Sequence, residues 1–341
     1  MMDRRAFIRS IGSCTAGIAF SRSMTGIGQP ARAADLGHVA YQLSWVKNFQ
    51  FAGEYIADNR NYYRNAGVAV DLLAGGPALP VDPVVASGKA LIGQSEPDAT
   101  ANANMKGAGL RVIGACYQKS PYCMISMTRT ALRTPQDMIG KRIGIQSSNL
   151  FLWRVFLKIN KIDPGSMRIV PVQFEFSPLI SGEVDGFFGY SNDDVVHLRA
   201  RGQDITYFLL ADHGYKLFTA TYTVQAASLA DSAKRAQLVA FMRGDIMGWQ
   251  DAVKDPALGA KLTVDIYGKG NGLIQAAEQQ SCMMSNALMV DDTTKAHGLF
   301  WMSEQAIQET IATMEAAGVK AAPAMFTNEI LAELYQGKAS L

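Results

Sequence analysis

The chain has 341 residues, of which 48% are hydrophobic and 18% charged, and its formal net charge is +2. This composition is too apolar for a disordered chain, and 4 cysteines are too few for a disulfide scaffold. The near-neutral charge, without a dense basic stripe, excludes an electrostatic nucleic-acid binder. At roughly 100–200 residues per domain, the length predicts two domains.

The first 33 residues have the pattern of an export signal. Arg4 and Arg5 precede a short apolar stretch over 11–20, as in a twin-arginine signal peptide, and Ala31-Arg32-Ala33 fits a small-x-small cleavage site. We expect cleavage after Ala33 and a periplasmic protein of 308 residues with a net charge of −2. The apolar stretch is shorter than the ~20 residues of a membrane-spanning helix, so we expect no membrane insertion.

Cysteine and histidine usage argues against a metal centre. Beyond the signal, Cys116, Cys123 and Cys282 remain, so at most one disulfide can form. The four histidines are scattered, and neither His-x-x-x-His nor Cys-x-x-Cys occurs. We expect core cysteines, no metal and no Cys/His nucleophile; lipidation at Cys14 stays open as an alternative.

Strand-like and helix-like segments alternate through the next part of the chain. The patterns predict strands at 38–45, 68–73, 90–93 and 110–117 and helices at 52–65, 82–87 and 97–106. Such alternation predicts a parallel sheet with helices on both faces.

The alternation restarts after a strand-like segment at 122–128 and a helix start at 134–137. Strands are expected at 142–146, 167–172, 184–190 and 205–210, and helices at 150–159, 178–181 and 193–201. A strand-like segment at 222–225 precedes helices expected at 232–252, 258–267, 273–289 and 304–316. We therefore expect a two-lobed α/β fold: lobe I from residues 34–129 and 222–341 with a helical C-terminal region, and lobe II, residues 130–221, inserted in it.

Two α/β lobes joined by two crossing segments leave a cleft between them, and ligands of such sheets bind at the carboxyl ends of the strands. After the first strand, Trp45 and Phe51 offer aromatic surfaces and Asn48 and Gln50 offer amides, a combination that suits an aromatic heterocycle. The alternatives are that Trp45 covers the core and that Asn48 caps a helix.

Two other loops carry polar or aromatic candidates. Ser95 and Glu96 follow the third strand, where a carboxylate can accept from an amino group, unless Ser95 only caps the next helix. In lobe II, Tyr190 can stack opposite Trp45, and Asn192 or Asp194 can bind a ring edge. Asp194 has the alternative role of a first-turn acid. Phe151, at the start of another helix, is a further candidate at the border of the cleft.

Cofactor motifs are missing from the sequence. There is no Gly-x-x-x-x-Gly-Lys-Ser/Thr, no Gly-x-Gly-x-x-Gly after a strand and no Gly-x-Ser-x-Gly. We therefore expect no nucleotide cofactor and no catalytic serine elbow.

The pattern Trp-x-x-Asn-x-Gln-x-Ala-Gly begins at Trp45 and ends at Gly53. Colinear motifs follow at 75–77, 82–88, 134–144, 182–186, 248–256 and 326–329. With them the chain resembles the thiamine-pyrimidine-precursor binding family, which includes ABC-importer binding proteins and thiamine-pyrimidine synthases. The resemblance implies a type II periplasmic-binding fold and capture of a small ligand, such as a formylaminopyrimidine or hydroxymethylpyrimidine, for an ABC-importer permease. We expect a monomer.

Departures from the family pattern leave two alternatives open. Phe51 stands where the pyrimidine-binding branch tends to carry His, and Asp194 stands in for a Glu, which makes riboflavin a rival ligand. The synthase branch consumes pyridoxal phosphate and an active-site His. Here Ser95 replaces its Schiff-base Lys and Ala99 replaces its His, so we expect a binding protein and not an enzyme.

Overall fold

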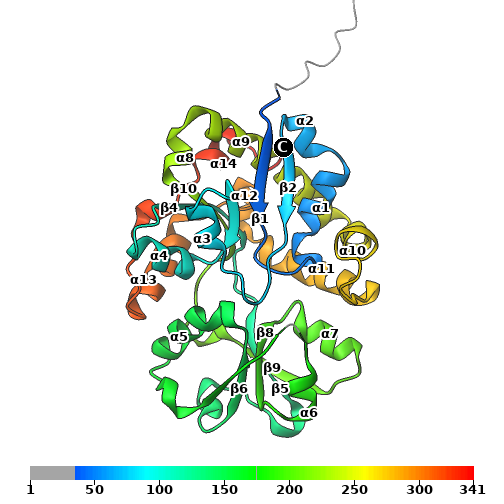
Figure 1. Ribbon diagram of the computed structural model, residues 1–341, viewed down its shortest axis with the longest axis vertical. Coiled ribbons are helices and arrows are strands. Elements are labelled where there is room, and N and C mark those ends of the chain that lie inside the picture. Colours follow the sequence, from blue (N-terminus) through cyan, green and yellow to red (C-terminus); the bar gives the residue numbers. More distant parts are fainter. Residues whose placement is uncertain (1–34, 174) are drawn as a thin grey trace, which may run out of the picture. The chain divides into compact units, whose positions relative to one another are not determined.

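The computed structural model describes residues 35–341 except residue 174. The expected signal peptide, its cleavage after Ala33 and Cys14 lie outside the described residues. Within them, the chain forms two five-stranded sheets, each flanked by helices (Figure 1). No described helix is long and apolar enough to cross a membrane.

The first sheet has the strand order β2-β1-β3-β10-β4. Its strands are β1 His38–Gln42, β2 Ala69–Leu73, β3 Ile92–Ser95, β4 Leu110–Tyr117 and β10 Thr219–Gln225. The helices of this lobe are α1 Ala52–Asn59, α2 Tyr62–Ala66, α3 Val81–Ala86, α4 Pro97–Met105, α8 Ala226–Ala230, α9 Ser232–Lys254, α10 Pro256–Leu262, α11 Gln275–Met289, α12 Asp292–His297, α13 Glu304–Ala316 and α14 Glu329–Tyr335. A 3₁₀ helix, Phe49–Phe51, precedes α1, and a π-helical turn, Thr263–Tyr267, follows α10.

The second sheet has the order β7-β6-β8-β5-β9. Its strands are β5 Tyr122–Met127, β6 Arg142–Ile145, β7 Arg168–Pro171, β8 Gly186–Tyr190 and β9 Ile205–Leu209, and its helices are α5 Leu150–Ile159, α6 Ser177–Ser181 and α7 Asp194–Ala200. Alternate residues of β5 enter two different apolar clusters: Met124 packs in the cluster of Trp153, whereas Cys123 packs in the cluster of Phe187. Both faces of this sheet are therefore covered, as expected.

The prediction of purely parallel sheets is wrong. β10 runs antiparallel to both of its neighbours, β3 and β4, and β5 runs antiparallel to β8 and β9. The cause is the path of the chain. β4 and β9 each end at the side of their sheet where the chain crosses to the other lobe, so the next strand enters its new sheet from that side and runs away from it. Two strands consequently begin at the cleft while their neighbours end there.

Strand pairing also bears on the expected lobe limits of 129/130 and 221/222. β5 pairs within the second sheet although the expected lobe I reached residue 129, and β10 begins in the first sheet at Thr219 although the expected lobe II reached 221. We therefore propose the two crossing segments, 118–121 and 210–218, as the lobe boundaries.

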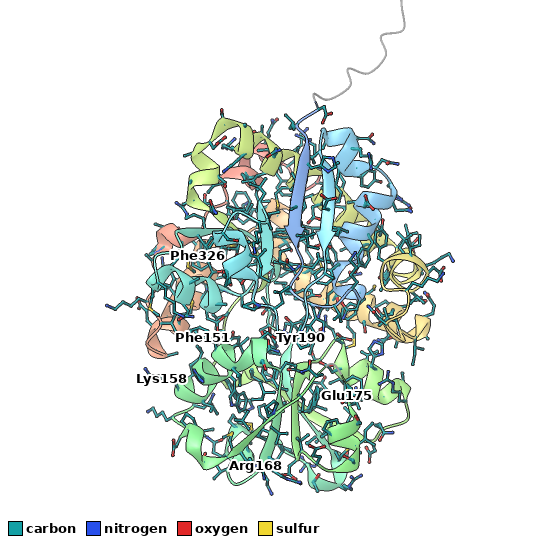
Figure 2. All side chains as sticks on the ribbon, in the orientation of Figure 1. Phe151, Lys158, Arg168, Glu175, Tyr190 and Phe326 are labelled. Carbon is teal, nitrogen blue, oxygen red and sulfur yellow. The ribbon has the colours of Figure 1, made fainter. Side chains whose placement is uncertain are left out.

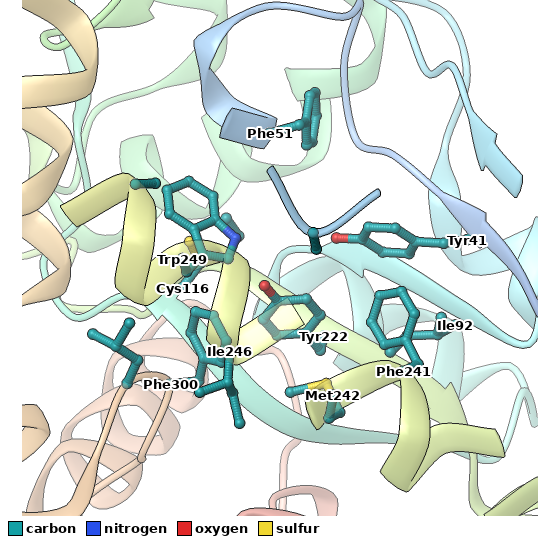
Figure 3. Close-up of a cluster of buried hydrophobic side chains, with 14 of the residues drawn as sticks. Tyr41, Phe51, Ile92, Cys116, Tyr222, Phe241, Met242, Ile246, Trp249 and Phe300 are labelled. Atoms are coloured by element: carbon teal, nitrogen blue, oxygen red, sulfur yellow. The ribbon is translucent and has the colours of Figure 1, made fainter. Parts of the chain in front are cut away.

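The core of the first lobe is rich in aromatic side chains. Tyr41, Tyr222 and Trp249 are almost fully buried in it, as is Phe51 (Figure 3). Helices α1 and α9 approach closely at Gly53, where an added Cβ would lie 2.2 Å from the Trp249 ring. A glycine is needed at this contact because no side chain fits between the helix and the indole.

The helix expected over 52–65 is divided in two. Asn61, between α1 and α2, has a φ of 59°, in the left-handed region, and this turns the chain between the two helices. Helices α8, α12 and α14, which the sequence patterns did not predict, complete the helical C-terminal region.

Candidate functional site

A cavity of about 110 Å³ lies between the two lobes. For comparison, an engineered apolar cavity of about 150 Å³ holds one benzene molecule. Lobe I lines it with Ser44, Trp45, Gln50, Leu79, Pro80, Val81, Asp82, Gln94, Ser95, Glu96 and Ala99, and lobe II with Tyr122, Gln146, Ser148, Asn149, Gly189, Tyr190, Asp193 and Asp194. The cavity is thus somewhat smaller than one that holds a single benzene ring.

The structure brings most of the expected site residues to this cavity. Those that line it are Trp45, Gln50, Ser95, Glu96, Tyr190 and Asp194. They come from the ends of β1, β3 and β8 and from the turns that follow these strands. The rule that ligands bind at carboxyl ends of strands thus led to residues that line the cavity, and their role in ligand binding stays a prediction.

The other expected residues do not line the cavity. Asn48 and Asn192 are fully buried, and Phe51 packs edge-to-face on Tyr55 with ring centres 6.4 Å apart. Phe151 (Figure 2) packs against an apolar cluster that includes residues of both lobes. The Asn48 side chain caps the 3₁₀ helix by accepting from Gln50 N at 3.1 Å. Its alternative role as a helix cap is thus the one that the structure shows.

Glu96 is the polar centre of the cavity wall. Its Oε1 accepts from the hydroxyls of Tyr122 at 3.3 Å and Tyr190 at 3.4 Å and from Ala220 N at 3.4 Å. Its Oε2 is buried and has no hydrogen-bond partner among the described residues. Burial raises the pKa of the Glu96 carboxyl well above its usual range, and the nearby Asp98 raises it further.

Tyr122 and Tyr190 form the aromatic wall of lobe II. Their rings meet edge-to-face, with centres 4.5 Å apart and planes at 76°. Because both hydroxyls donate to Glu96 of lobe I, this contact joins the two lobes directly beside the cavity.

At the carboxyl end of β3, hydrogen bonds to neighbouring polar groups hold the side chains of Gln94 and Ser95. Gln94 Oε1 accepts from Ser44 Oγ at 2.7 Å, whereas its Nε2 is buried without a partner in the described part of the chain. The Ser95 hydroxyl donates to Asp82 Oδ2 at 2.5 Å, and Thr100 donates to Asp82 Oδ1 at 2.7 Å. Burial raises the pKa of Asp82, and these two hydroxyl donors partly oppose that rise.

Asp194 closes the cavity from lobe II. Its Oδ2 accepts from Tyr190 N at 2.7 Å, and burial raises the pKa of its carboxyl to about 6. Gly189 makes room for this carboxylate, because a Cβ there would lie 2.2 Å from Asp194 Oδ2. Asp194 is thus both a first-turn acid of α7 and a cavity residue.

A buried polar network joins the lobes next to the cavity; we call Asn48, Asp193, His197 and Glu278 the interlobe network. Asn48 Nδ2 donates to Asp193 Oδ2 at 2.8 Å, and His197 Nε2 lies 2.8 Å from Glu278 Oε1 and 3.5 Å from Asp193 Oδ1. Glu278 Oε2 also accepts from Phe49 N at 2.9 Å. Burial raises the pKa of Asp193 well above its usual range, and Asp194 and Glu278 add to the effect.

Asn192, the residue before Asp193, makes a similar link between the lobes. Its Nδ2 donates to Ser285 Oγ of α11 at 2.9 Å and lies 3.4 Å from the Tyr117 hydroxyl, where β4 ends. Its amide therefore joins the lobes and does not reach the cavity.

Sequence reasoning missed Tyr122 as a site residue. It is the first residue of β5, and only the reversed direction of this strand brings it to the cleft. The sequence feature that could have indicated Tyr122 is its position directly after the crossing segment that ends at Pro121.

The charge of the cavity wall is one-sided. Asp82, Glu96, Asp193 and Asp194 line it, and no Lys, Arg or His among the described residues does. No group of three or more His, Cys, Asp or Glu suited to a metal ion occurs within residues 35–341 as described. The wall can bind an uncharged or cationic ring by stacking and hydrogen bonds, but it offers no cation to an anion.

Comparisons with known proteins agree with this architecture. The chain is 23% identical to the riboflavin-binding protein RibY of Chloroflexus aurantiacus, over 94% of each chain. A solved protein from Bordetella bronchiseptica RB50 superposes with a TM-score of 0.68 at 17% identity, over 88% of this chain and 97% of that one. The alkanesulfonate-binding protein SsuA of Xanthomonas axonopodis pv. citri, bound to MOPS, gives 0.62 at 16% identity, over 86% and 97%.

These structural matches confirm the two-lobed α/β fold of periplasmic binding proteins. Residues 48–258 match the family model described as NMT1/THI5 like, which confirms the resemblance in the motifs. A match over more than half of the chain identifies this protein as a member of the NMT1/THI5-like family.

Proposed function

We propose that this chain is the exported, periplasmic solute-binding protein of an ABC importer and that it closes its two lobes over a small aromatic nitrogen heterocycle. The observation that carries the proposal is the cavity between the lobes, in which Trp45, Tyr122 and Tyr190 supply ring surfaces. Beside them, Gln94 Nε2, Glu96 Oε2 and Asp193 Oδ1 are buried polar atoms without hydrogen-bond partners among the described residues. The binding-protein fold and the riboflavin-binding relative support this function.

The size of the cavity favours a single ring. A volume of about 110 Å³ is nearer to one ring than to three, and we therefore place a thiamine pyrimidine precursor of the hydroxymethylpyrimidine or formylaminopyrimidine type first. Riboflavin is the second candidate because the relative that is 23% identical is a riboflavin-binding protein. Its three-ring system requires a wider opening of the lobes. Phe51 does not widen the cavity toward a larger ring, since its side chain is buried in the core.

Binding without turnover fits the residues at the cavity. Ser95 stands where the synthase resemblance implies a Schiff-base lysine, and its hydroxyl is bound to Asp82. Ala99, in place of the synthase histidine, lines the cavity with a methyl group that cannot move a proton. The cavity wall thus has neither an amine nucleophile nor an imidazole.

The contacts between the lobes explain how a ligand favours closure. Glu96 of lobe I and the two tyrosines of lobe II meet in the closed arrangement, so a ring in the cavity beside them contacts both lobes. An aromatic pair contributes about 0.5–1.5 kcal/mol beyond its buried area, and a hydrogen bond about 0.5–1.5 kcal/mol. Because these contacts are complete only when the lobes are closed, the ligand shifts the population toward the closed state. A permease of the importer then receives the closed, monomeric complex.

Titration of the purified chain without its first 33 residues tests this function, with the fluorescence of Trp45 and thermal unfolding as readouts. The ligands are 4-amino-5-hydroxymethyl-2-methylpyrimidine, its N-formylamino relative, riboflavin and ethanesulfonate. We expect at least one heterocycle to stabilise the protein by about 2.7 kcal/mol at a concentration of about 100 times its Kd. Stabilisation by ethanesulfonate alone would exclude the heterocycle function.

A further inference from the structure

In the described part of the chain, the cavity wall has four carboxyl groups and no cationic side chain. Asp82 and Glu96 come from lobe I, and Asp193 and Asp194 from lobe II. A bound anion would meet these carboxyls with no positive charge to oppose them. A ligand that carries a positive charge, or that donates hydrogen bonds, is attracted by the same carboxyls.

Two side chains of the wall indicate which hydrogen-bonding groups a ligand would carry. Gln94 is 1% exposed, and its Nε2 is a donor without an acceptor among the described residues. Glu96 Oε2 is a buried acceptor without a donor among them. Buried polar atoms are normally paired, so these two indicate a ligand with an acceptor near Gln94 and a donor near Glu96.

The other carboxyls of the wall are engaged to different degrees. Both oxygens of Asp82 accept hydroxyl donors, and Asp194 Oδ2 accepts from a backbone amide. Asp193 Oδ2 accepts from Asn48, whereas its Oδ1, which faces His197 at 3.5 Å, has no hydrogen-bond partner among the described residues. Of the two carboxyls with an unpaired buried oxygen, Glu96 is the one that bonds to both tyrosines of the aromatic wall, and we therefore take it as the acceptor for the ligand.

The electrostatic surroundings of Glu96 favour the same kind of ligand. Burial and the neighbouring Asp98 raise the pKa of its carboxyl, because no cationic group among the described residues of the wall offsets the negative charge. A cationic or readily protonated ligand supplies the missing compensation, because an opposite charge at hydrogen-bond distance favours the ionised carboxylate.

We propose that Glu96 is the specificity-determining side chain of the cavity: it selects a ring that carries an amino donor and is cationic or readily protonated, while Gln94 donates to a ring acceptor. Anions, including sulfonates, are rejected by the same wall. The inference rests on the proposed function and deepens it, since it fixes the hydrogen-bonding order and the charge of the ligand.

The experiment compares two pyrimidines that differ in one group, 4-amino-5-hydroxymethyl-2-methylpyrimidine and its 4-hydroxy analogue, by isothermal titration. The analogue presents a carbonyl oxygen in its major tautomer where the first compound presents an amino group. With the wild-type chain we expect the amino compound to bind about 10–100-fold more tightly, because the analogue places an acceptor against Glu96 Oε2.

The variant Glu96→Gln keeps the shape of the side chain but offers an amide donor. The preference for the amino compound should fall to near 1 or invert in this variant. The control Asp82→Asn changes a carboxyl whose two oxygens are already bonded, so both affinities should change by similar factors and the preference should remain. If Glu96→Gln fails to fold, the wild-type preference still tests the proposal.

Equal affinity of the two pyrimidines for the wild type, or an unchanged preference in a folded Glu96→Gln, would overturn this inference but leave the heterocycle function in place. Tight binding of ethanesulfonate with no binding of either pyrimidine or riboflavin would overturn both. The two failures are thus distinguishable.

Discussion

The replacement of His197 by Ala tests whether the interlobe network holds the lobes together. His197 lies on α7 of lobe II and is 3% exposed, and its Nε2 is 2.8 Å from Glu278 Oε1 on α11 of lobe I. Removal of one partner of a buried hydrogen bond to a carboxylate costs about 3 kcal/mol, because Glu278 Oε1 then stays buried without that partner. The cost falls on the closed state if the lobes separate between α7 and α11, since Glu278 then regains water.

The effect should appear as weaker ligand binding, although neither side chain lines the cavity. A closed state destabilised by about 3 kcal/mol raises the apparent Kd by about 100-fold, because only the closed fraction binds. Titration with tryptophan fluorescence as the readout measures the Kd. X-ray scattering of the proteins without added ligand should show a larger radius of gyration for His197→Ala than for the wild type. Glu278→Gln, which keeps one acceptor oxygen for Phe49 N and presents its amide NH2 to His197, should have a smaller effect.

A matched control is His297→Ala. This histidine is exposed and stacks on Trp301 within lobe I, with ring centres 5.1 Å apart, so its loss should leave both measurements unchanged. The reasoning is refuted if His197→Ala lowers the melting temperature but changes neither the Kd nor the radius of gyration. The pair would then be a fixed contact of the fold that closure does not use.

Three further predictions concern the core. Burial raises the pKa of Asp245 to about 7, so the folded state holds a proton that the unfolded state releases near pH 4, and stability should fall as the pH rises from 4 through 7. In urea unfolding, the free energy of unfolding of Asp245→Asn should therefore rise relative to that of the wild type as the pH increases from 5 to 8. A difference that does not change with pH would contradict this. Gly53→Ala should cost about 1–3 kcal/mol or more through its clash with Trp249, whereas Gly76→Ala, with no atom within 4 Å of the new Cβ, should cost far less. Cys116 and Cys123 are free, and burial raises the pKa of both thiols; a thiol reagent should label them only after unfolding, and labelling of the native protein would count against the packing.

Much of the local structure could be predicted because it depends on short-range patterns. The apolar run of β4 and the apolar face of α5 predicted the same limits that the structure has, 110–117 and 150–159. Other limits shifted by a few residues, as with β1, which ends at Gln42 and not at 45. The turn at Asn61 was not predictable from apolar spacing, since both halves of the expected helix carry the same pattern.

For the site, the sequence located the loops but not the direction of each side chain. Trp45, Glu96 and Tyr190 follow or end strands, and the general rule for open α/β sheets places such residues at a ligand. Asn48 and Asn192 stand in the same loops, yet they turn to partners on the other lobe. A polar residue next to a cleft can bond either to a ligand or to the opposite lobe, and composition does not distinguish the two.

The sequence by itself determined the two α/β units, the family and the absence of a lysine or histidine at the synthase positions Ser95 and Ala99, because motifs and periodicity are local properties of the chain. Only the tertiary structure decided that β5 and β10 run against their neighbours, which brings Tyr122 to Glu96. It also decided that Asn48 meets Asp193, 145 residues away. The physical reason is that strand direction and contacts between lobes depend on the side from which the chain enters each sheet, and no short segment carries that information.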